Sequence, residues 1–293
     1  MTPPPFADRL ADAVRSRGNP LCVGIDPRFE SLPSCIQHAH DDGTLTGRAR
    51  AFEEFGLRIV ELVGHLVPAI KPQSAFFEAC GPAGFIAQQA ILKRASEAGA
   101  ITVLDSKRGD IASTAAAYAE ASYHVWQADS VTVNPYLGQD AVEPFIAAAR
   151  QAQRGLFVLV RTSNPGSGLF QNLTCDGQPL YRHVAGAVND WNAGGLGRCG
   201  LGDVGAVVGA THPDELRELR ALMPDVWFLV PGFGAQGGSA ENVAGGFRPD
   251  GLGAIVNSSR GITFPFHPDD SEWEAKIVAA TLQAISQLKA VMP

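Results

Sequence analysis

Residues 101–111 read ITVLDSKRGDI. The run begins with β-branched and apolar residues, ends in charged ones, and leads into a segment with helical periodicity that extends to residue 126. A short apolar run followed by a helix is typical of a β-strand and the helix that returns the chain to the next parallel strand. Repetition of this unit would predict an alternating β/α fold.

The unit recurs eight times along the chain. Each apolar run precedes a longer helical segment, and only the glycine-rich stretch after the seventh run predicts a short helix. The runs are LCVGID (21–26), AIKPQ (69–73), ITVLDSK (101–107), SVTVNP (130–135), LFVLVRT (156–162), VGAVVGA (204–210), WFLVPG (227–232) and LGAIVNSS (252–259). Eight strands separated by helices favour a closed (β/α)8 TIM barrel over an open doubly wound sheet.

The predicted barrel is expected to form one domain over residues 1–293. Two connections are longer than usual, at about 27–50 and at 163–179, where the sequence is SNPGSGLFQNLTCDGQP. Both follow predicted strands, so both lie on the side of a barrel where active sites are found. Long loops there usually cover the active-site mouth or mediate assembly.

Charge and hydropathy exclude several classes of partner. The net charge of -7 and pI near 5.5 argue against nucleic acid or an anionic membrane, because either would require an extended basic face. No apolar run reaches the roughly 18 residues of a membrane span, and the first residues lack the apolar core of a signal peptide. We therefore expect a cytoplasmic protein.

The cysteines and histidines do not predict a metal or disulfide framework. The five cysteines are scattered and show no CxxC spacing, so they are expected to be reduced thiols. The histidines are also dispersed, and the one close pair, His38 and His40, lies in a polar stretch. The pattern of cysteines and histidines thus predicts no metal site.

Charged residues gather where predicted strands end. Asp105 and Lys107 are two residues apart on one strand and are expected to point to the same side. Asp110 follows near the start of the next helix, and Lys71 closes the preceding strand. Asp110 alone could be a helix N-cap. Asp105 and Lys107 could be an ion pair that fills the barrel mouth. Alternating lysines and aspartates in one mouth favour a proton-transfer site, in which pKa values are tuned by opposite charges.

Several motifs together resemble one enzyme family. The chain contains VGID, AIKPQSAFFE, DSKRGDI, TSNPG, PGFGAQGG and NSSRGI in that order, from about residue 21 to 262. This set resembles the orotidine 5'-monophosphate decarboxylases, and specifically the longer, type 2 subgroup. Relatives with different chemistry share the DxKxxD element alone, whereas its combination with AIKPQ and GAQGG is highly specific.

The resemblance implies a cofactor-free carboxy-lyase that converts orotidine 5'-monophosphate (OMP) to UMP in pyrimidine biosynthesis. It makes Lys71, Asp105, Lys107 and Asp110 the charged catalytic network, with Lys107 beside C6 of the pyrimidine. It also implies a homodimer, in which Asp110, Ile111 and Thr114 of one subunit line the active site of the other.

The resemblance also assigns residues to substrate binding. Asp26 would hold ribose hydroxyls and Ser163 the base, Gln236 would extend from the phosphate toward the pyrimidine, and Arg260 would bind the phosphate. The loops after strands seven and eight of TIM barrels often bind phosphate, and glycines there let backbone amides approach the anion. Judged by spacing alone, glycine-rich turns beside a surface arginine are the less favoured alternative.

Three other functions are compatible with the same charged element. One is a Mg²⁺-dependent decarboxylase or aldolase that acts on a sugar phosphate, which a metal requirement would reveal. Another is an aldolase that forms a Schiff base through Lys71 or Lys107, although neighbouring acids are expected to raise the pKa of these lysines. The last is a catalytically silent nucleotide-binding barrel, which would bind UMP without turning over OMP.

Overall fold

The computed structural model describes residues 3–234 and 238–293. Eight parallel strands close into a barrel in the order β1-β10-β9-β8-β5-β4-β3-β2, which confirms the predicted TIM barrel. Each predicted apolar run forms one of these strands. Their bounds are Leu21–Ile25 (β1), Ala69–Pro72 (β2), Ile101–Arg108 (β3), Ser130–Val133 (β4), Gly155–Arg161 (β5), Val204–Val208 (β8), Phe228–Val230 (β9) and Ala254–Ser258 (β10).

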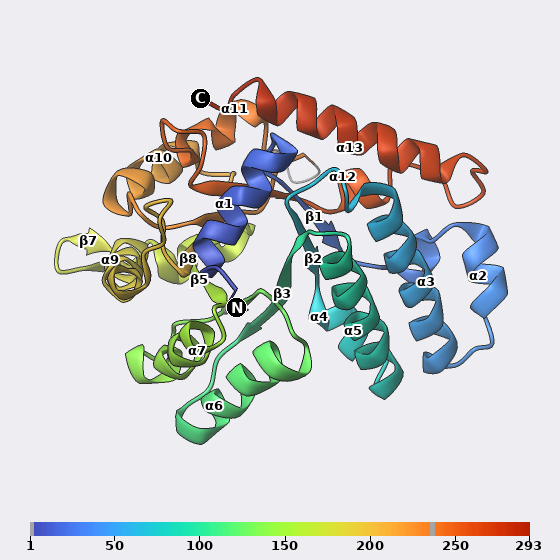
Figure 1. Cartoon of the computed structure of the whole chain (residues 1–293), viewed down its shortest axis with the longest axis horizontal. Coiled ribbons are helices and arrows are strands. Elements are labelled where there is room, and N and C mark those ends of the chain that lie inside the picture. Colours follow the sequence, from blue (N-terminus) through green and yellow to red (C-terminus); the bar gives the residue numbers. More distant parts are fainter. Residues whose placement is uncertain (1–2, 235–237) are drawn as a thin grey trace.

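Helices surround the strands as an outer ring (Figure 1). The element after β9 is short, as predicted, and a π-helical turn (Ala121–Val125) extends the helix after β3. The main helices are α3 (Leu45–Val63), α5 (Pro82–Glu97), α6 (Ala112–Glu120), α7 (Gln139–Gln151), α9 (Leu180–Asn192), α10 (Pro213–Leu222), α11 (Ala240–Val243) and α13 (Trp273–Lys289). No helix of the described residues is both long and apolar enough to span a membrane.

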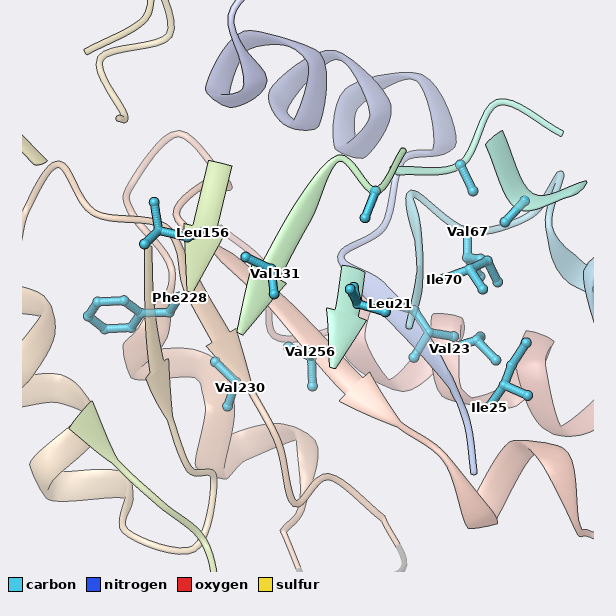
Figure 2. Close-up of a cluster of buried hydrophobic side chains, with 14 of the residues drawn as sticks. Leu21, Val23, Ile25, Val67, Ile70, Val131, Leu156, Phe228, Val230 and Val256 are labelled. Carbon is cyan, nitrogen blue, oxygen red and sulfur yellow. The ribbon is translucent and has the colours of Figure 1, made fainter. Parts of the chain in front are cut away.

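Side chains of each strand alternate between two buried layers. One layer lies between the strands and the helices and includes Leu21, Val131 and Val256, all labelled in Figure 2. The other fills the barrel interior and includes Val103 and Ile255. Because side chains alternate along a strand, the residues two positions further on also face the interior, one layer nearer the C-terminal end. This alternation places polar residues of several strands in one layer at the barrel mouth.

The N-terminal helix α1 (Phe6–Arg17) closes the opposite end of the barrel, and the sequence analysis did not predict it. Its apolar residues Phe6, Leu10 and Val14 recur every four positions and pack in the interior cluster. The ring of Phe6 meets that of Phe157 edge to face, with centroids 6.1 Å apart. In Figure 1 this helix crosses in front of the strands. Its short apolar stripe was the signal that could have revealed it.

The two long connections contain short ordered elements. The first carries η1 (Phe29–Ser31) and α2 (Ser34–His40), and the second carries η3 (Pro165–Ser167), α8 (Gly168–Gln171) and a hairpin of β6 (Thr174–Cys175) and β7 (Gln178–Pro179). Two further short helices follow barrel strands: α4 (Ser74–Glu78) after β2 and α12 (Arg260–Thr263) after β10. These short, structured segments lie on the C-terminal rim, meaning the ends of the eight strands and the loops after them.

Replacing Phe6 by alanine is expected to lower the free energy of unfolding by about 3–5 kcal/mol, because it leaves a cavity at the sealed end of the barrel. The side chain of Phe6 is fully buried. Urea unfolding followed by circular dichroism measures the change. Phe85→Ala is the control, since Phe85 is 41% exposed and its ring stacks on that of Trp126. A loss no greater than that of the control would contradict the sealing role of α1.

Candidate active site

A cavity of about 420 Å³ opens at the C-terminal rim. It brings together six residues that the sequence analysis singled out, from β1, β2, β3, β5 and β10 and the loops after them: Asp26, Lys71, Asp105, Lys107, Ser163 and Arg260. A second cavity of about 660 Å³ shares Ser163 and Arg260 with the first and extends beneath the 163–179 segment. Gln236 lies outside the described residues. The rim is therefore hollow where the charged residues converge, as expected for a binding site.

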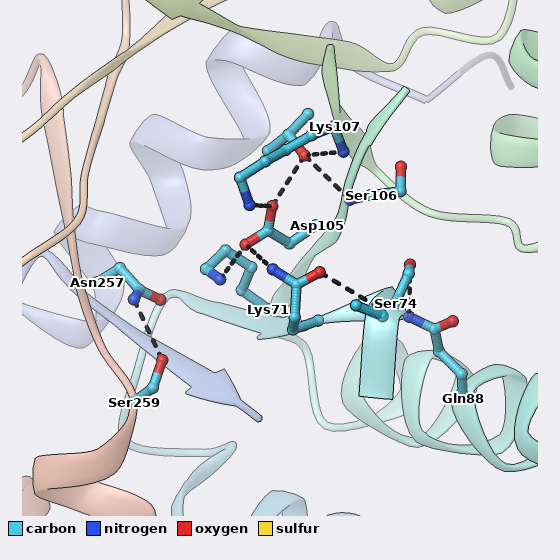
Figure 3. Close-up of polar contacts among 11 residues, drawn as sticks. Lys71, Ser74, Gln88, Asp105, Ser106, Lys107, Asn257 and Ser259 are labelled. Atoms are coloured by element: carbon cyan, nitrogen blue, oxygen red, sulfur yellow. Dashed lines mark hydrogen bonds and ion pairs between the residues drawn. The ribbon is translucent and has the colours of Figure 1, made fainter. Parts of the chain in front are cut away.

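The buried carboxylate of Asp105 is the centre of the charged cluster. Its Oδ2 accepts hydrogen bonds from Lys71 Nζ at 2.6 Å and from Gln73 Nε2 at 3.1 Å. Its Oδ1 accepts from Lys107 Nζ at 2.6 Å and from Thr132 Oγ1 at 2.9 Å. Figure 3 shows that each of the two lysine side chains contacts a different oxygen of this carboxylate. One carboxylate therefore bridges two ammonium groups.

Burial and charge act in opposite directions on this cluster. Burial alone would raise the pKa of Asp105, but the ammonium groups of Lys71 and Lys107 outweigh it and hold that pKa well below its ordinary value. Burial would likewise lower the pKa of Lys71, yet the negative charges of Asp105 and Asp26 raise it above its ordinary value. Both groups are thus ionised at neutral pH, and each depends on the other for its charge.

Lys107 reaches Asp105 from an unusual backbone conformation. Its φ of 47° lies in the left-handed region, which non-glycine residues rarely adopt. The pairing of β3 with β4 shifts register between Leu104 and Arg108, which spans this position. Thr132 Oγ1 accepts hydrogen bonds from the backbone amides of Ser106, at 3.0 Å, and Lys107, at 2.8 Å. Its hydroxyl also donates to Asp105, so Thr132 fixes both the strained backbone and the carboxylate.

Asp110, Ile111 and Thr114 lie away from this cluster. Helix α6 begins at Ala112 with Ile111 as its N-cap, and no side chain caps it. Asp110 is therefore not the N-cap that it could have been, and its Oδ1 accepts instead from the amide of Ile111 at 2.8 Å. Ile111 is 55% exposed and Thr114 is exposed. Among the described residues, Asp110 forms no ion pair with Lys107 of its own chain.

Two buried acceptors face the cavity at the junction of β1 and β10. Asp26 follows β1, and its Oδ1 is buried without a hydrogen bond within residues 3–234 and 238–293. Asn257 on β10 is 8% exposed, and its Oδ1 is also buried without a hydrogen bond from any described residue. The Asn257 amide donates only to Ser259 Oγ, at 3.3 Å. Both acceptors are available to a donor on a ligand, because an unpaired buried polar atom is costly.

Three residues of the site escaped the sequence analysis: Gln73, Thr132 and Asn257. Each lies inside a quoted motif but carries no charge, and an uncharged polar residue in a strand is an ambiguous signal. The position of Thr132 among apolar neighbours in SVTV would have been informative, since it shares the interior-facing side of its strand. Asn257 likewise follows Ile255 at the two-residue spacing of an interior face.

A further network holds the first half of the 163–179 segment. The buried guanidinium of Arg161, at the end of β5, pairs with Glu215 of α10 and donates from Nη1 to Ser167 Oγ and Gln171 Oε1, both at 3.2 Å. Gln171 in turn bonds both the backbone and the hydroxyl of Thr162. The wall of the larger cavity is therefore tied to the end of β5 and to helix α10.

The chain is similar to known proteins over most of its length. Residues 19–269 match the model of the orotidine 5'-phosphate decarboxylase / HUMPS family. An orotidine 5'-phosphate decarboxylase of Rhodopirellula baltica is 44% identical, over 97% of this chain and 99% of the relative. A decarboxylase of the same name from Roseiflexus castenholzii is 41% identical, over 97% and 96% of the two chains.

Solved structures give the same result. The structure of Leishmania donovani OMP decarboxylase superposes with a TM-score of 0.78 at 35% identity, covering 98% of both chains. The match extends over nearly the whole barrel, including every strand that contributes to the charged cluster. This chain belongs to the orotidine 5'-phosphate decarboxylase / HUMPS family.

Proposed function

We propose that this protein decarboxylates OMP to UMP and CO2 without a cofactor, as the last step of UMP biosynthesis. The observation that carries the proposal is the Lys71–Asp105–Lys107 cluster at the mouth of a barrel of this family. We further infer that residues 1–293 form one domain. The enzyme is expected to act in the cytoplasm, because a charged nucleotide does not cross a membrane unaided.

Lys107 is the residue that we assign to the reacting carbon. Loss of CO2 from C6 leaves an electron pair on that carbon with no adjacent carbonyl to delocalise it. The Lys107 ammonium stabilises this charge as it develops and then transfers a proton from Nζ to C6, which yields UMP. Its side chain is 45% exposed, on the wall of the cavity, so Nζ is accessible to a bound ligand.

Asp105 holds both ammonium groups in place and can also act on the substrate. A carboxylate about 4 Å from the leaving carboxylate would repel it by roughly 4 kcal/mol at an effective dielectric constant near 20. This is a partial share of the roughly 8–23 kcal/mol by which enzymes lower barriers. Stabilisation of the transition state by Lys107 is therefore the main contribution in our proposal, and repulsion by Asp105 is an addition to it.

The nucleotide's remaining groups would bind around the two cavities. Arg260 binds the phosphate, and Gln236 extends from the phosphate toward the pyrimidine. Ser163 binds the base, and Asp26 accepts from a ribose hydroxyl with Lys71 beside it. The buried, unpartnered Oδ1 of Asp26 within the described chain supports this last role. Binding energy from phosphate and ribose, remote from C6, holds the pyrimidine against Lys107.

The proposed homodimer completes the site with Asp110, Ile111 and Thr114 of the partner subunit. The loops after β3 and β4 lie side by side, since the amide of Asn134 donates to the carbonyl of Arg108 at 2.8 Å. They expose large apolar side chains: Ile111 at 55%, Tyr136 at 83% and Leu137 at 47%. Such a group of exposed apolar residues is typical of an association surface. Its proximity to Asp110 supports the assignment of this carboxylate to a neighbouring subunit.

The first test is the conversion of OMP by purified protein treated with EDTA. We expect rapid loss of OMP absorbance in the wild type and none in Lys107→Ala, because the variant lacks the ammonium that we assign to the protonation of C6. Inactive but folded wild type that recovers on addition of Mg²⁺ would instead favour a metal-dependent sugar-phosphate enzyme. Trapping of a lysine by borohydride with a keto substrate would favour a Schiff-base aldolase.

Replacing Asp105 by asparagine is expected to lower the free energy of unfolding by about 3–5 kcal/mol at pH 7, because Lys71 loses its buried counter-charge. The folded-state pKa of Asp105 is depressed. Its stabilisation is therefore present above the unfolded-state pKa of about 3.9 and is lost as the pH falls toward the folded-state value. Urea unfolding of wild type and variant at pH 7 and pH 3 measures the difference in unfolding free energy and its dependence on pH. A difference between wild type and variant that does not narrow at pH 3 would contradict this account.

Mixed dimers test the partner's contribution. Lys107→Ala and Asp110→Ala should each be inactive alone, since every site of either homodimer lacks one group. After co-refolding, random pairing makes half of the dimers hybrids with one intact site, so about a quarter of wild-type activity should return. As a control, each single variant is mixed with the Lys107→Ala, Asp110→Ala double variant, a pairing that forms no intact site. Recovery equal to that control would place Asp110 in the site of its own chain.

A further inference from the structure

Arg161 is buried at the C-terminal rim outside the charged cluster, with a relative exposure of 2%. It is an unusual residue for this position, because a guanidinium is costly to remove from water unless its donors are satisfied. Its Nε and Nη2 donate to the carboxylate of Glu215, the latter at 3.3 Å. Its guanidinium also lies 5.4 Å from the centroid of the Tyr181 ring. Glu215 and Tyr181 thus fix the orientation of this fork.

The remaining edge of the Arg161 fork points at the 163–179 segment. Its Nη1 donates to Ser167 Oγ and to Gln171 Oε1, both at 3.2 Å. Gln171 Oε1 also accepts from the Thr162 amide at 3.0 Å, and its Nε2 donates to Thr162 Oγ1 at 2.8 Å. Thr162 Oγ1 then donates to Asn164 Oδ1 at 2.7 Å. These bonds form a continuous chain from α10 to the wall of the cavity.

We name this set the latch network: Arg161, Thr162, Ser167, Gln171 and Glu215. It closes residues 162–171 into a loop whose two ends are joined through the side chain of Gln171. That loop contributes Ser163 and Asn164 to both cavities of the rim. Arg260, the proposed phosphate ligand, lines the same two cavities. The conformation of this loop therefore sets the shape of the proposed nucleotide site.

Stability alone is a weak reason for such a network. A buried ion pair is often no more stabilising than packed apolar residues, whereas it can specify one geometry among several. Arg161 supplies four hydrogen bonds to three partners on three different elements, which a lysine could not do from one point charge. Precise support of residues near a ligand is a common use of such buried polar contacts.

We propose that Arg161 is a positioning residue, which acts through Gln171 and Ser167 to hold residues 162–171 in the conformation that binds the nucleotide. The inference rests on the proposed function and adds to it a set of residues outside the charged cluster. The network does not touch Lys107 or Asp105. Its loss is therefore expected to weaken nucleotide binding and leave the chemical step of the bound substrate nearly unchanged.

Gln171→Ala is the main test, with Gln178→Ala as its control. Gln171 is only partly buried, so its replacement is expected to leave the barrel folded. Gln178 lies in the same segment and is exposed. Its side chain forms no hydrogen bond with any described residue. We expect Gln171→Ala to raise the Kd of UMP and the KM of OMP about tenfold, which corresponds to the loss of one or two hydrogen bonds. The kcat should stay within about twofold, and the control should match the wild type.

Glu215→Gln and Glu218→Gln form a second matched pair on α10. Glu218 lies one helical turn after Glu215 and pairs with Arg182 at 3.0 Å, outside both cavities. Glu215→Gln should reproduce the binding defect of Gln171→Ala, because Arg161 loses the carboxylate that orients it. Glu218→Gln should not. Unchanged Kd and KM in both Gln171→Ala and Glu215→Gln would overturn the proposal, as would a fall in kcat with binding unchanged.

Limited digestion with chymotrypsin separates this inference from the proposed function. Phe170 is 61% exposed within the looped segment. Cleavage after Phe170 should be faster in Gln171→Ala and Glu215→Gln than in wild type and the two controls, even without nucleotide. Equal cleavage rates would overturn the inference. Wild type that neither binds UMP nor converts OMP would overturn the proposed function, while the cleavage comparison would still report whether the latch network holds the segment.

Discussion

The carboxylate of Asp105, shared between two ammonium groups, is the interaction on which the architecture of the rim depends. Without it, Lys71 would be a buried cation with a relative exposure of only 4%. The remaining lone pairs of the carboxylate are occupied by Gln73 and Thr132, as a buried ion requires. The cluster is therefore a closed arrangement, in which each polar group satisfies another. Its order keeps Lys107 Nζ at one side of the cavity before any ligand arrives.

The barrel supplies this order through the alternation of its strands. Val103 and Asp105 share the interior face of β3, and Ala69 and Lys71 share that of β2. A regular strand would also direct residue 107 inward, but the left-handed backbone at Lys107 and the register shift beside it redirect the chain toward the rim. Strain of this kind persists only where surrounding bonds determine it, and the Thr132 hydroxyl provides those bonds. Backbone strain thus lies at the residue that we propose as the proton donor.

Sequence patterns predicted the barrel and the charged cluster because both follow from local signals. The eight apolar runs are periodic, and charges at strand ends stand out against them. Helix α1 escaped because its apolar stripe is short and no strand precedes it within the repeated unit. Thr132 and Gln73 escaped because an uncharged polar side chain acquires meaning only from its neighbours in space. Arg161 lay in a quoted motif, but its partner Glu215 is 54 residues away, a distance that no local pattern bridges.

Two parts of the rim are held in place by different interactions. The charged cluster is held by the barrel strands themselves and is fixed before a ligand binds. The wall opposite depends on side-chain bonds across a segment that exposes Leu169 and Phe170 at 71% and 61%. Because these two apolar side chains are exposed, we expect the bonds of the latch network to contribute much of the local stability of the segment. Within a single chain, Lys107 has one carboxylate partner and the cluster carries two lysines against one aspartate. Asp26 and Arg260 line the same cavity, so the described residues place three cations there against two carboxylates. That excess of positive charge favours an anionic ligand, and a partner's Asp110 would offset it in the proposed dimer.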